Sequence, residues 1–153
     1  MNGPDLSGNP LKLSVGLLVA SYIIGEFIFP KYPLLYIFNL VGVIGMIFSI
    51  SLFIAGFSIF QRYEENPAPS SGSNRLIKTG VFAYTRNPIY LSFVLFFLSM
   101  FLIFENVMYC LSALGVSIWL HHWIIRAEEE YLDSHFGDEY NRYKNSVSRW
   151  IFF

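Results

Sequence analysis

The sequence predicts an all-α membrane protein with about four transmembrane helices, the last two in a tight hairpin, and an amphipathic cytoplasmic helix near the C-terminus. Hydrophobic residues make up 54% of the 153 residues and charged residues 14%, against roughly 25% charged residues in an average soluble domain. The mean hydropathy is +0.48. A soluble globule of this size has too little interior to bury so much apolar surface. We therefore expect one integral membrane domain over residues 1–153.

The first two apolar runs are each long enough to cross a bilayer. Residues 13–29 form the first run, which Pro30 and Pro33 close because proline cannot continue a helix. Residues 34–60 form the second run. It exceeds the roughly 20 residues that a crossing needs, so we expect a tilted helix or a protruding end.

The third and fourth runs predict a helical hairpin. They cover residues 89–104 and 107–125, and only Glu105 and Asn106 separate them. A two-residue connection forces two helices to run antiparallel and side by side. The third run is marginal for a full crossing, so the hairpin could be embedded rather than cleanly spanning.

The basic residues predict which way the spans point. With four spans, nine of the ten Lys and Arg residues fall at one end of the bundle, and only Lys31 falls at the other. Positive charge is retained on the cytoplasmic side of membrane proteins. Both termini and the loop over residues 61–87 are therefore expected to be cytoplasmic. The net charge of −1 leaves no basic field for nucleic acid, which we exclude as a partner.

Small and polar residues within the second run indicate helix–helix contact. Gly42, Gly45 and Ser49 would let another helix approach closely. Asn39 is expected to form an interhelical hydrogen bond.

The segment after the fourth run carries a helical stripe. Its apolar and aromatic members recur every three or four residues: Leu132, Phe136, Tyr140, Tyr143 and Val147. Gly137 is expected to bend or divide this helix. An aromatic stripe of this kind beside a membrane commonly packs on the interface.

Two polar clusters could carry chemistry. In the first, residues 76–90, Gly80 permits a turn or a close backbone approach. Asn87 is expected to cap the third helix, and Pro88 suits its first turn. A helix start of this kind can bind an anionic or polar ligand, or Arg86 can simply meet lipid headgroups.

The second cluster, residues 126–130, holds three consecutive glutamates at the expected end of the fourth helix. Carboxylates there oppose the helix dipole, so Arg126, a cation or ligand hydroxyls should compensate them, unless the run is merely solvated. His121 and His122 precede the cluster and point about 100° apart, so they cannot both face one site. No established metal-ligand spacing is present, and we expect no metal site.

These clusters contain two motifs of a known family. The first is Leu-x-x-x-Gly-x-x-x-x-x-Arg-Asn-Pro-x-Tyr, from Leu76 to Tyr90. It resembles the Arg-His/Asn-Pro-x-Tyr signature of the isoprenylcysteine carboxyl methyltransferase and phospholipid methyltransferase superfamily. The segment from Glu128 to Trp150 looks like the second signature. The resemblance covers residues 66–150, and Asn87 departs from the histidine that is usual in the isoprenylcysteine enzymes.

The resemblance implies a membrane-embedded enzyme that binds S-adenosylmethionine where the two motifs meet. A lipophilic or lipidated acceptor would enter from the bilayer, and the phenylalanines of the third run would line its path or face lipid (Phe93, Phe96, Phe97 and Phe101). The cofactor-binding residues implied are Gly80, Tyr84, Arg86, Asn87, Pro88, Tyr90, His122, Glu128 and Glu129. The catalytic residues implied are Arg86, Glu129 and Arg149.

Several chemistries stay open. Methyl transfer from a sulfonium is an in-line displacement that needs positioning more than acid–base work. A carboxylate acceptor, as in isoprenylcysteine O-methylation, needs only an arginine to orient it. An amine acceptor, as in phospholipid N-methylation, needs a group that takes a proton. More distant alternatives are a nicotinamide-dependent sterol-type reductase, normally a longer chain, and a helical membrane protein without enzymatic activity.

Overall fold

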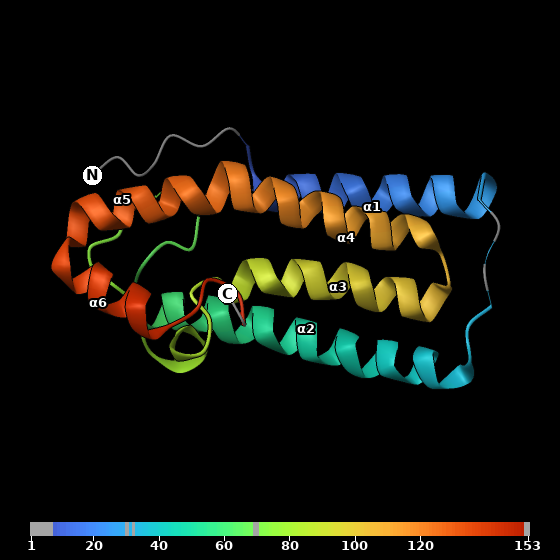
Figure 1. Ribbon diagram of the computed structural model, residues 1–153, viewed down its shortest axis with the longest axis horizontal. Helices are drawn as coiled ribbons and strands as arrows, with labels where there is room; N and C mark the ends of the chain where they lie inside the picture. Colours follow the sequence, from blue (N-terminus) through green and yellow to red (C-terminus); the bar gives the residue numbers. More distant parts are fainter. Residues whose placement is uncertain (1–7, 30, 32, 69–70, 152–153) are drawn as a thin grey trace.

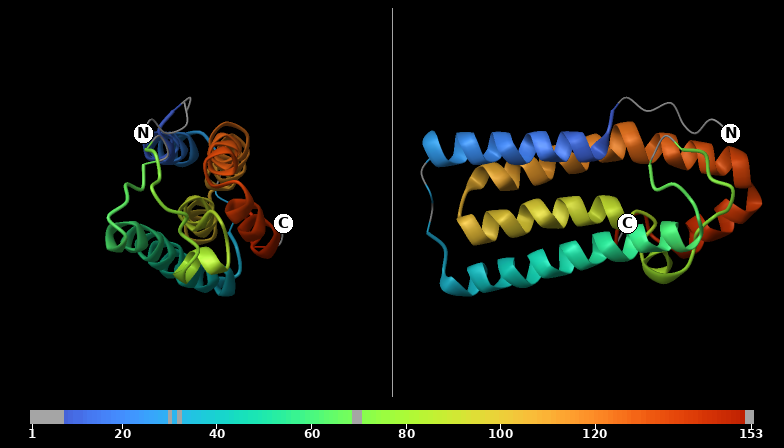
Figure 2. Two further views of the ribbon diagram at one scale, coloured as in Figure 1. Left: turned by 90° about the vertical axis from the view of Figure 1, so that its left-hand side faces the viewer. Right: turned by 180° about the vertical axis from the view of Figure 1, so that it is seen from behind.

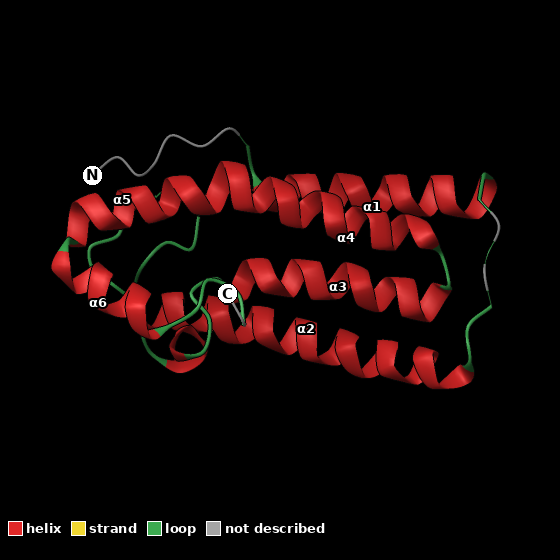
Figure 3. Cartoon of the chain, in the orientation of Figure 1, coloured by secondary structure: helices red, strands yellow, loops and turns green. Residues whose placement is uncertain are grey.

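The computed structural model describes residues 8–29, 31, 33–68 and 71–151. Over these residues the chain is helical, with loops and no strand (Figure 3). Pro30, which closes the first predicted run, lies outside the described residues. The elements in chain order are α1 (Pro10–Phe27), α2 (Tyr36–Arg62), the 3₁₀ turn η1 (Gly80–Ala83), α3 (Pro88–Phe104), α4 (Val107–Trp119), the π-helical turn η2 (Leu120–Ile125), α5 (Arg126–Phe136) and α6 (Asp138–Ser146).

Three helices in the described part of the chain are long and apolar enough to cross a membrane: Pro10–Phe27, Tyr36–Arg62 and Val107–Phe136. The apolar part of the last one ends at Ile125, about the length that a crossing needs, so α5 lies beyond the crossing. The fourth, α3, has 17 residues, or about 25 Å at 1.5 Å per residue, somewhat short of a hydrocarbon core of about 30 Å. Many large apolar side chains of α1 and α2 are exposed, as lipid-facing side chains are. The expected all-α membrane fold is confirmed.

The four long helices pack in the order α1, α4, α3, α2 rather than in chain order. The start of α1, the end of α2 and the start of α3 lie toward the end of the bundle that carries α5 and α6 (Figures 1 and 2). We call this the motif end, and the opposite end, at the hairpin connection between α3 and α4, the hairpin end. The even number of crossings inferred from the sequence is consistent with this arrangement.

Small residues bring α2 against α3, as predicted. A Cβ atom on Gly42 would lie 2.9 Å from Cβ of Leu102, and one on Gly45 would lie 2.7 Å from Oγ of Ser99. The Ser49 hydroxyl donates a hydrogen bond to the carbonyl of Ser92 at 2.8 Å. These contacts leave no room for larger side chains on this face of α2.

The hairpin end is closed by a polar cluster. Asn39 donates through Nδ2 to the carbonyl of Leu102 at 2.9 Å, which confirms its interhelical role. The Glu105 carboxylate accepts from the backbone N–H of Leu34 at 3.0 Å and from Asn39 at 3.3 Å. Asn106 caps α4 by accepting from the N–H of Met108 at 3.0 Å. Backbone N–H and C=O groups near the hairpin turn, which lack helical partners, thereby find hydrogen-bond partners inside the bundle.

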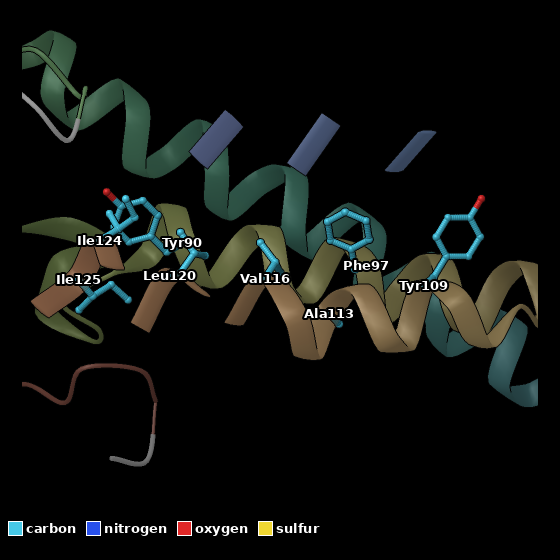
Figure 4. Close-up of a cluster of buried hydrophobic side chains, with 8 residues drawn as sticks. All are labelled: Tyr90, Phe97, Tyr109, Ala113, Val116, Leu120, Ile124 and Ile125. Atoms are coloured by element: carbon cyan, nitrogen blue, oxygen red, sulfur yellow. The ribbon is translucent and has the colours of Figure 1, made fainter. Parts of the chain in front are cut away.

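The core runs along the contact between α3 and α4 and reaches the motif end (Figure 4). Its members are Tyr90, Phe97, Tyr109, Ala113, Val116, Leu120, Ile124 and Ile125. The cluster ends beside Tyr90, whose side chain belongs to the first motif. The core therefore fixes the position of one wall of the site directly.

The fourth predicted helix does not end at residue 125. It continues through η2 into α5, so the glutamates lie inside a long helix and not at its C-terminus. The expectation that they oppose a helix dipole was therefore wrong. Gly137, with φ +49°, ends α5, and α6 folds back toward the start of α3 (Figure 1). This division of the helix at Gly137 was predicted.

Candidate active site

One buried carboxylate joins the two motifs. Glu129, on α5, accepts at Oε1 from Arg86 Nη2 at 2.9 Å and from Arg149 Nε at 3.0 Å. Arg149 Nη2 also donates to the second oxygen, so the guanidinium binds the carboxylate in a bidentate manner. Arg86 and Glu129 expose only 9% and 10% of their side chains. The compensating charges for this glutamate are thus Arg86 and Arg149, whereas Arg126 is exposed.

The ionisation of Glu129 is determined by this network. Burial alone would raise its pKa, but the hydrogen bond from Arg149 and the charge of Arg86 outweigh burial and hold the pKa below its usual value. The same bond raises the pKa of Arg149. Glu129 is therefore ionised at neutral pH, and two arginines share one carboxylate.

The neighbouring carboxyl behaves differently. Glu128 accepts a hydrogen bond from the Tyr90 hydroxyl at 2.6 Å. Withdrawal from water raises the pKa of Glu128 to about 8, with the charge of Glu129 adding to the effect and the Tyr90 bond opposing it. Glu128 therefore holds a proton at neutral pH that a nearby cation can displace.

The C-terminal segment is tied to the start of α3. The carbonyl of Arg149 accepts from Thr85 Oγ1 at 3.1 Å and from Asn87 Nδ2 at 2.9 Å. The backbone N–H of Arg86 donates to the carbonyl of Ser148 at 3.0 Å. Asn87 stands at the N-cap position of α3, but its side chain makes no capping hydrogen bond. The expected capping role was wrong because the side-chain amide of Asn87 donates instead to the carbonyl of Arg149 in the C-terminal segment.

A cavity opens between the two motifs and the loop after α2. The space between its walls is about 940 Å³ when its mouth, which is open to solvent, is included. Aromatic rings and carboxyl groups share its wall with apolar side chains. The lining includes Phe60, Arg75, Leu76, Ile77, Phe82, Arg86, Asn87, Pro88, Ile89, Tyr90, Glu128, Glu129, Tyr131, Leu132, Tyr140 and Tyr143.

Six of the predicted cofactor-binding residues lie in this lining: Arg86, Asn87, Pro88, Tyr90, Glu128 and Glu129. The other three lie outside it. Tyr84 is 81% exposed, and His122 is exposed on η2. Gly80 also lies outside the lining, but its φ is +61° and a Cβ atom added to it would lie 2.6 Å from Ile59 Cδ1, which confirms the predicted close approach.

Arg149 and the histidines lie behind the cavity wall. Arg149 is absent from the lining and reaches the site through Glu129. Of the two histidines, His121 lies nearer the network, with Nε2 at 3.4 Å from Arg149 Nη1. The phenylalanines of α3 do not line the cavity either, and Phe97 is buried in the core at 1% exposure. Of the two expectations for these phenylalanines, the one that makes them walls of this cavity is therefore not met.

Sequence reasoning missed the loop between α2 and η1. Arg75 lines the cavity from this loop, with its guanidinium 5.7 Å from the ring centroid of Tyr63 and 3.8 Å from Glu65. The Tyr131 hydroxyl accepts from the N–H of Ser73 at 3.3 Å and joins the loop to α5. Glu65 is buried in the structure, but in the sequence it stands in a polar, turn-like segment and carried no signal of a site. The other missed wall, Phe82, is fixed by the Tyr143 hydroxyl, which donates to its carbonyl at 2.7 Å.

Comparison with known proteins agrees with the geometry. A curated, uncharacterized protein of Haemophilus influenzae is 40% identical over 63 residues, which are 41% of this chain and the whole of that protein. Residues 35–139 match the phospholipid methyltransferase family, which lies within the superfamily that the two motifs resemble. That match extends from α2 through the cavity wall to the start of α6. The chain belongs to the phospholipid methyltransferase family.

Proposed function

We propose that this chain transfers a methyl group from S-adenosylmethionine to a lipophilic acceptor held in the membrane, most like a carboxylate of the isoprenylcysteine type. Family membership supports methyl transfer to a lipid-related substrate. The observation that carries the proposal is the cavity at the motif end, where Glu128 and the Arg86–Glu129 pair meet aromatic rings beside an apolar bundle.

The residues present fit the cofactor. When bound, S-adenosylmethionine supplies an electrophilic methyl group on a positively charged sulfonium. Carboxylates and aromatic faces favour such a cation, and the cavity offers Glu128, Tyr90 and Tyr140 for this purpose. Arg86 Nε is buried and has no hydrogen-bond partner among the described residues, so the wall retains a donor for a polar ligand group.

The chain's own groups would act mainly by positioning. Arg86 and Arg149 form ion pairs with Glu129. These pairs hold the three side chains in fixed positions in and behind the cavity wall. Such a preorganised, water-poor site strengthens the electrostatic interactions within it. A carboxylate acceptor needs no proton transfer, so orientation beside Arg86 suffices for attack on the methyl group.

One observation favours a second acceptor. The pKa of Glu128 is about 8, so the ionised form of Glu128 can take the proton that an amine loses on N-methylation. An ethanolamine-type phospholipid is therefore the alternative acceptor. The difference between the two lies in whether activity depends on Glu128 as a proton acceptor.

The membrane position of the cavity supports a lipophilic acceptor. The cavity is lined by residues of the loop after α2, the start of α3, α5 and α6. These elements lie together at one end of the bundle (Figure 1). An acceptor with its reactive group at this level can keep its chains in the bilayer. Since the α3 phenylalanines do not line the cavity, we propose that the chains stay in lipid beside the bundle rather than in a groove along α3.

A methyl-transfer assay in detergent or lipid nanodiscs tests the proposal. A farnesylcysteine acceptor and a phosphatidylethanolamine acceptor should be compared, each with chains of increasing length. Each methylene that leaves water contributes up to about 0.8 kcal/mol, so activity at subsaturating acceptor should rise steeply with chain length. Equal activity on short, soluble analogues would refute a membrane-fed site. Glu128→Gln should impair the amine reaction more than the carboxylate reaction.

We further propose that the motif end faces the cytoplasm, together with both termini. A cysteine replacing Ser71, in a Cys110→Ser background, should react with an impermeant maleimide only when the cytoplasmic side is accessible. A cysteine replacing Lys31 serves as the opposite marker. Labelling of position 71 from outside would overturn the orientation.

A further inference from the structure

The helix that carries the glutamates changes register just before them. Ala113, Val116 and Leu120 are 1%, 0% and 0% exposed and form a buried stripe along α4 and the first residue of η2 that faces α3. Their spacings of three and four residues are those of an ordinary α-helix. The stripe then passes through η2, where six residues adopt the π-helical form.

Without this turn the glutamates would face the wrong way. At about 100° per residue, an uninterrupted α-helix would place Glu128 about 90° and Glu129 about 180° from the centre of the stripe. Glu129 would then point away from α3 and from Arg86. The α-helical continuation of the stripe would instead bring Ala127 into line with Leu120.

The extra residue of the π-helical turn corrects the register. A π turn accommodates one residue more than an α turn, so the residues after η2 are turned back by about 100° relative to α4. Glu128 then lies in line with the stripe and Glu129 flanks it, in agreement with their bonds to Tyr90 and Arg86. Leu132, one turn later, also falls on this line and lines the cavity.

The burial pattern within η2 shows the same shift. Ile124 and Ile125 are adjacent, yet both are 0% exposed, and both lie beside Tyr90 at the end of the core (Figure 4). A wide turn lets two successive side chains enter one interface. His122 and Trp123 take up the outer side, and Trp123 is 51% exposed.

We propose that the π-helical turn Leu120–Ile125 is the positioning element of the site: by adding one residue to the helix, it turns Glu128 and Glu129 into the cavity. The inference rests on the proposed function for its consequence in binding, whereas the rotation of α5 can be measured without any ligand. Such turns are frequent at functional sites.

Deletion of Trp123 tests the proposal because it removes the extra residue and no buried side chain. A regular α-helix that is one residue shorter points Glu128 and Glu129 in the same direction as the parent helix with its π-helical turn. The deletion variant should therefore bind S-adenosylmethionine within about threefold of the parent, measured by titration calorimetry on the full chain in detergent. One alanine inserted between Ile125 and Arg126 of the parent should instead turn the glutamates by about 100° and weaken binding by tenfold or more. Trp123→Ala, which keeps the register, should bind within about twofold of the parent. A tenfold loss of binding in the deletion variant but not in Trp123→Ala, or parent-like binding in the insertion variant, would overturn the proposal.

A ligand-independent readout separates this inference from the proposed function. Glu130 is exposed, so a cysteine replacing it in a Cys110→Ser background should react rapidly with maleimide. The insertion should turn that cysteine toward the place that Tyr131 now occupies in the cavity wall, and labelling should slow by tenfold or more. The deletion should leave labelling unchanged. Unchanged labelling in the insertion variant would contradict the rotation even if the parent bound no S-adenosylmethionine.

If the insertion variant does not fold, the deletion variant still tests the proposal. It should keep parent-like binding and parent-like labelling at position 130, because the shorter α-helix keeps the register. A loss of both would overturn the proposal.

Discussion

The hairpin end and the motif end of this bundle both bury polar groups, but for different purposes. At the hairpin end, Asn39 and Glu105 bond mainly to backbone groups that a membrane leaves without water. At the motif end, Glu128 and Glu129 bond to side chains from other elements and line a cavity. Polar side chains that hydrogen-bond to the backbone stabilise the end of a bundle. Charged side chains that pair with one another beside a cavity indicate a functional site.

The two adjacent glutamates also differ in this way, one having a structural role and the other being available to a ligand. Glu129 has two arginine partners and is ionised, while Glu128 has one tyrosine partner and a pKa of about 8. Glu129 therefore acts as a structural link between the motifs, and Glu128 remains available to a ligand. Their environments, not their residue type, separate the two roles.

The largest expected effect follows from breaking the link. Glu129→Gln leaves Arg86 and Arg149 without a charged partner in a largely buried position, and we expect a loss of about 3 kcal/mol in unfolding free energy. Thermal or denaturant unfolding in detergent measures it. Glu130→Gln, on the exposed side of the same helix, is the matched control and should change little. Equal stability of the two variants would mean that the link is not structural.

A smaller effect is expected from pH at Glu128. Its folded pKa of about 8 lies above the ordinary value of 4.5, so its contribution to stability is complete below pH 4.5 and is lost as pH rises to about 8. Unfolding at pH 6 and pH 8 should show a decrease of about 1 kcal/mol or more in the wild type. Glu128→Gln, which cannot ionise, should remove this decrease. A decrease of equal size in both proteins would assign it to other groups.

The same site predicts how cofactor binding depends on pH. A sulfonium cation favours the ionised form of Glu128, so affinity for S-adenosylmethionine should increase from pH 6 to pH 8 and level off above it. Calorimetry in buffers of different ionisation enthalpy would reveal the released proton. Glu128→Gln should release none, and proton release of the same size from this variant would remove Glu128 from the binding site.

Packing in the bundle should give a comparable but purely structural effect. Gly42→Ala places a methyl group 2.9 Å from Leu102 Cβ and 3.1 Å from the backbone nitrogen of Ile103, and we expect it to cost about 1 kcal/mol. Gly115→Ala is the control, since a Cβ there meets nothing within 4 Å. That control should be neutral or slightly stabilising. Cofactor binding should be unchanged in both, in contrast to the motif-end variants.

The smallest effect is expected at the surface. Lys78 and Glu139 form an ion pair between the loop before η1 and α6, but both side chains are exposed and water and salt screen them. Lys78→Gln should alter neither unfolding nor methyl transfer measurably. A marked loss of activity would show that docking of α6 depends on this pair.

The sequence predicted the helices better than it predicted the site. Apolar runs, the Glu105–Asn106 connection and Gly137 each act through local chemistry, so the spans, the hairpin and the break before α6 were foreseeable. The π-helical turn was not, because two adjacent isoleucines are compatible with either helical form until α3 is packed against them. The roles of Asn87 and Arg75 also depend on segments distant in the chain, the C-terminal tail and the α2–η1 loop.

Titration calorimetry with S-adenosylmethionine on the full chain in detergent tests the central claim most directly. The wild type should bind saturably, and a nicotinamide dinucleotide should not bind. Glu128→Gln and Glu129→Gln should each weaken binding by roughly 1–3 kcal/mol, as expected for loss of a charged hydrogen bond in a buried site. Unchanged affinity in both variants and in the double variant, or binding of the nicotinamide dinucleotide instead, would contradict the assignment of this cavity to methyl transfer.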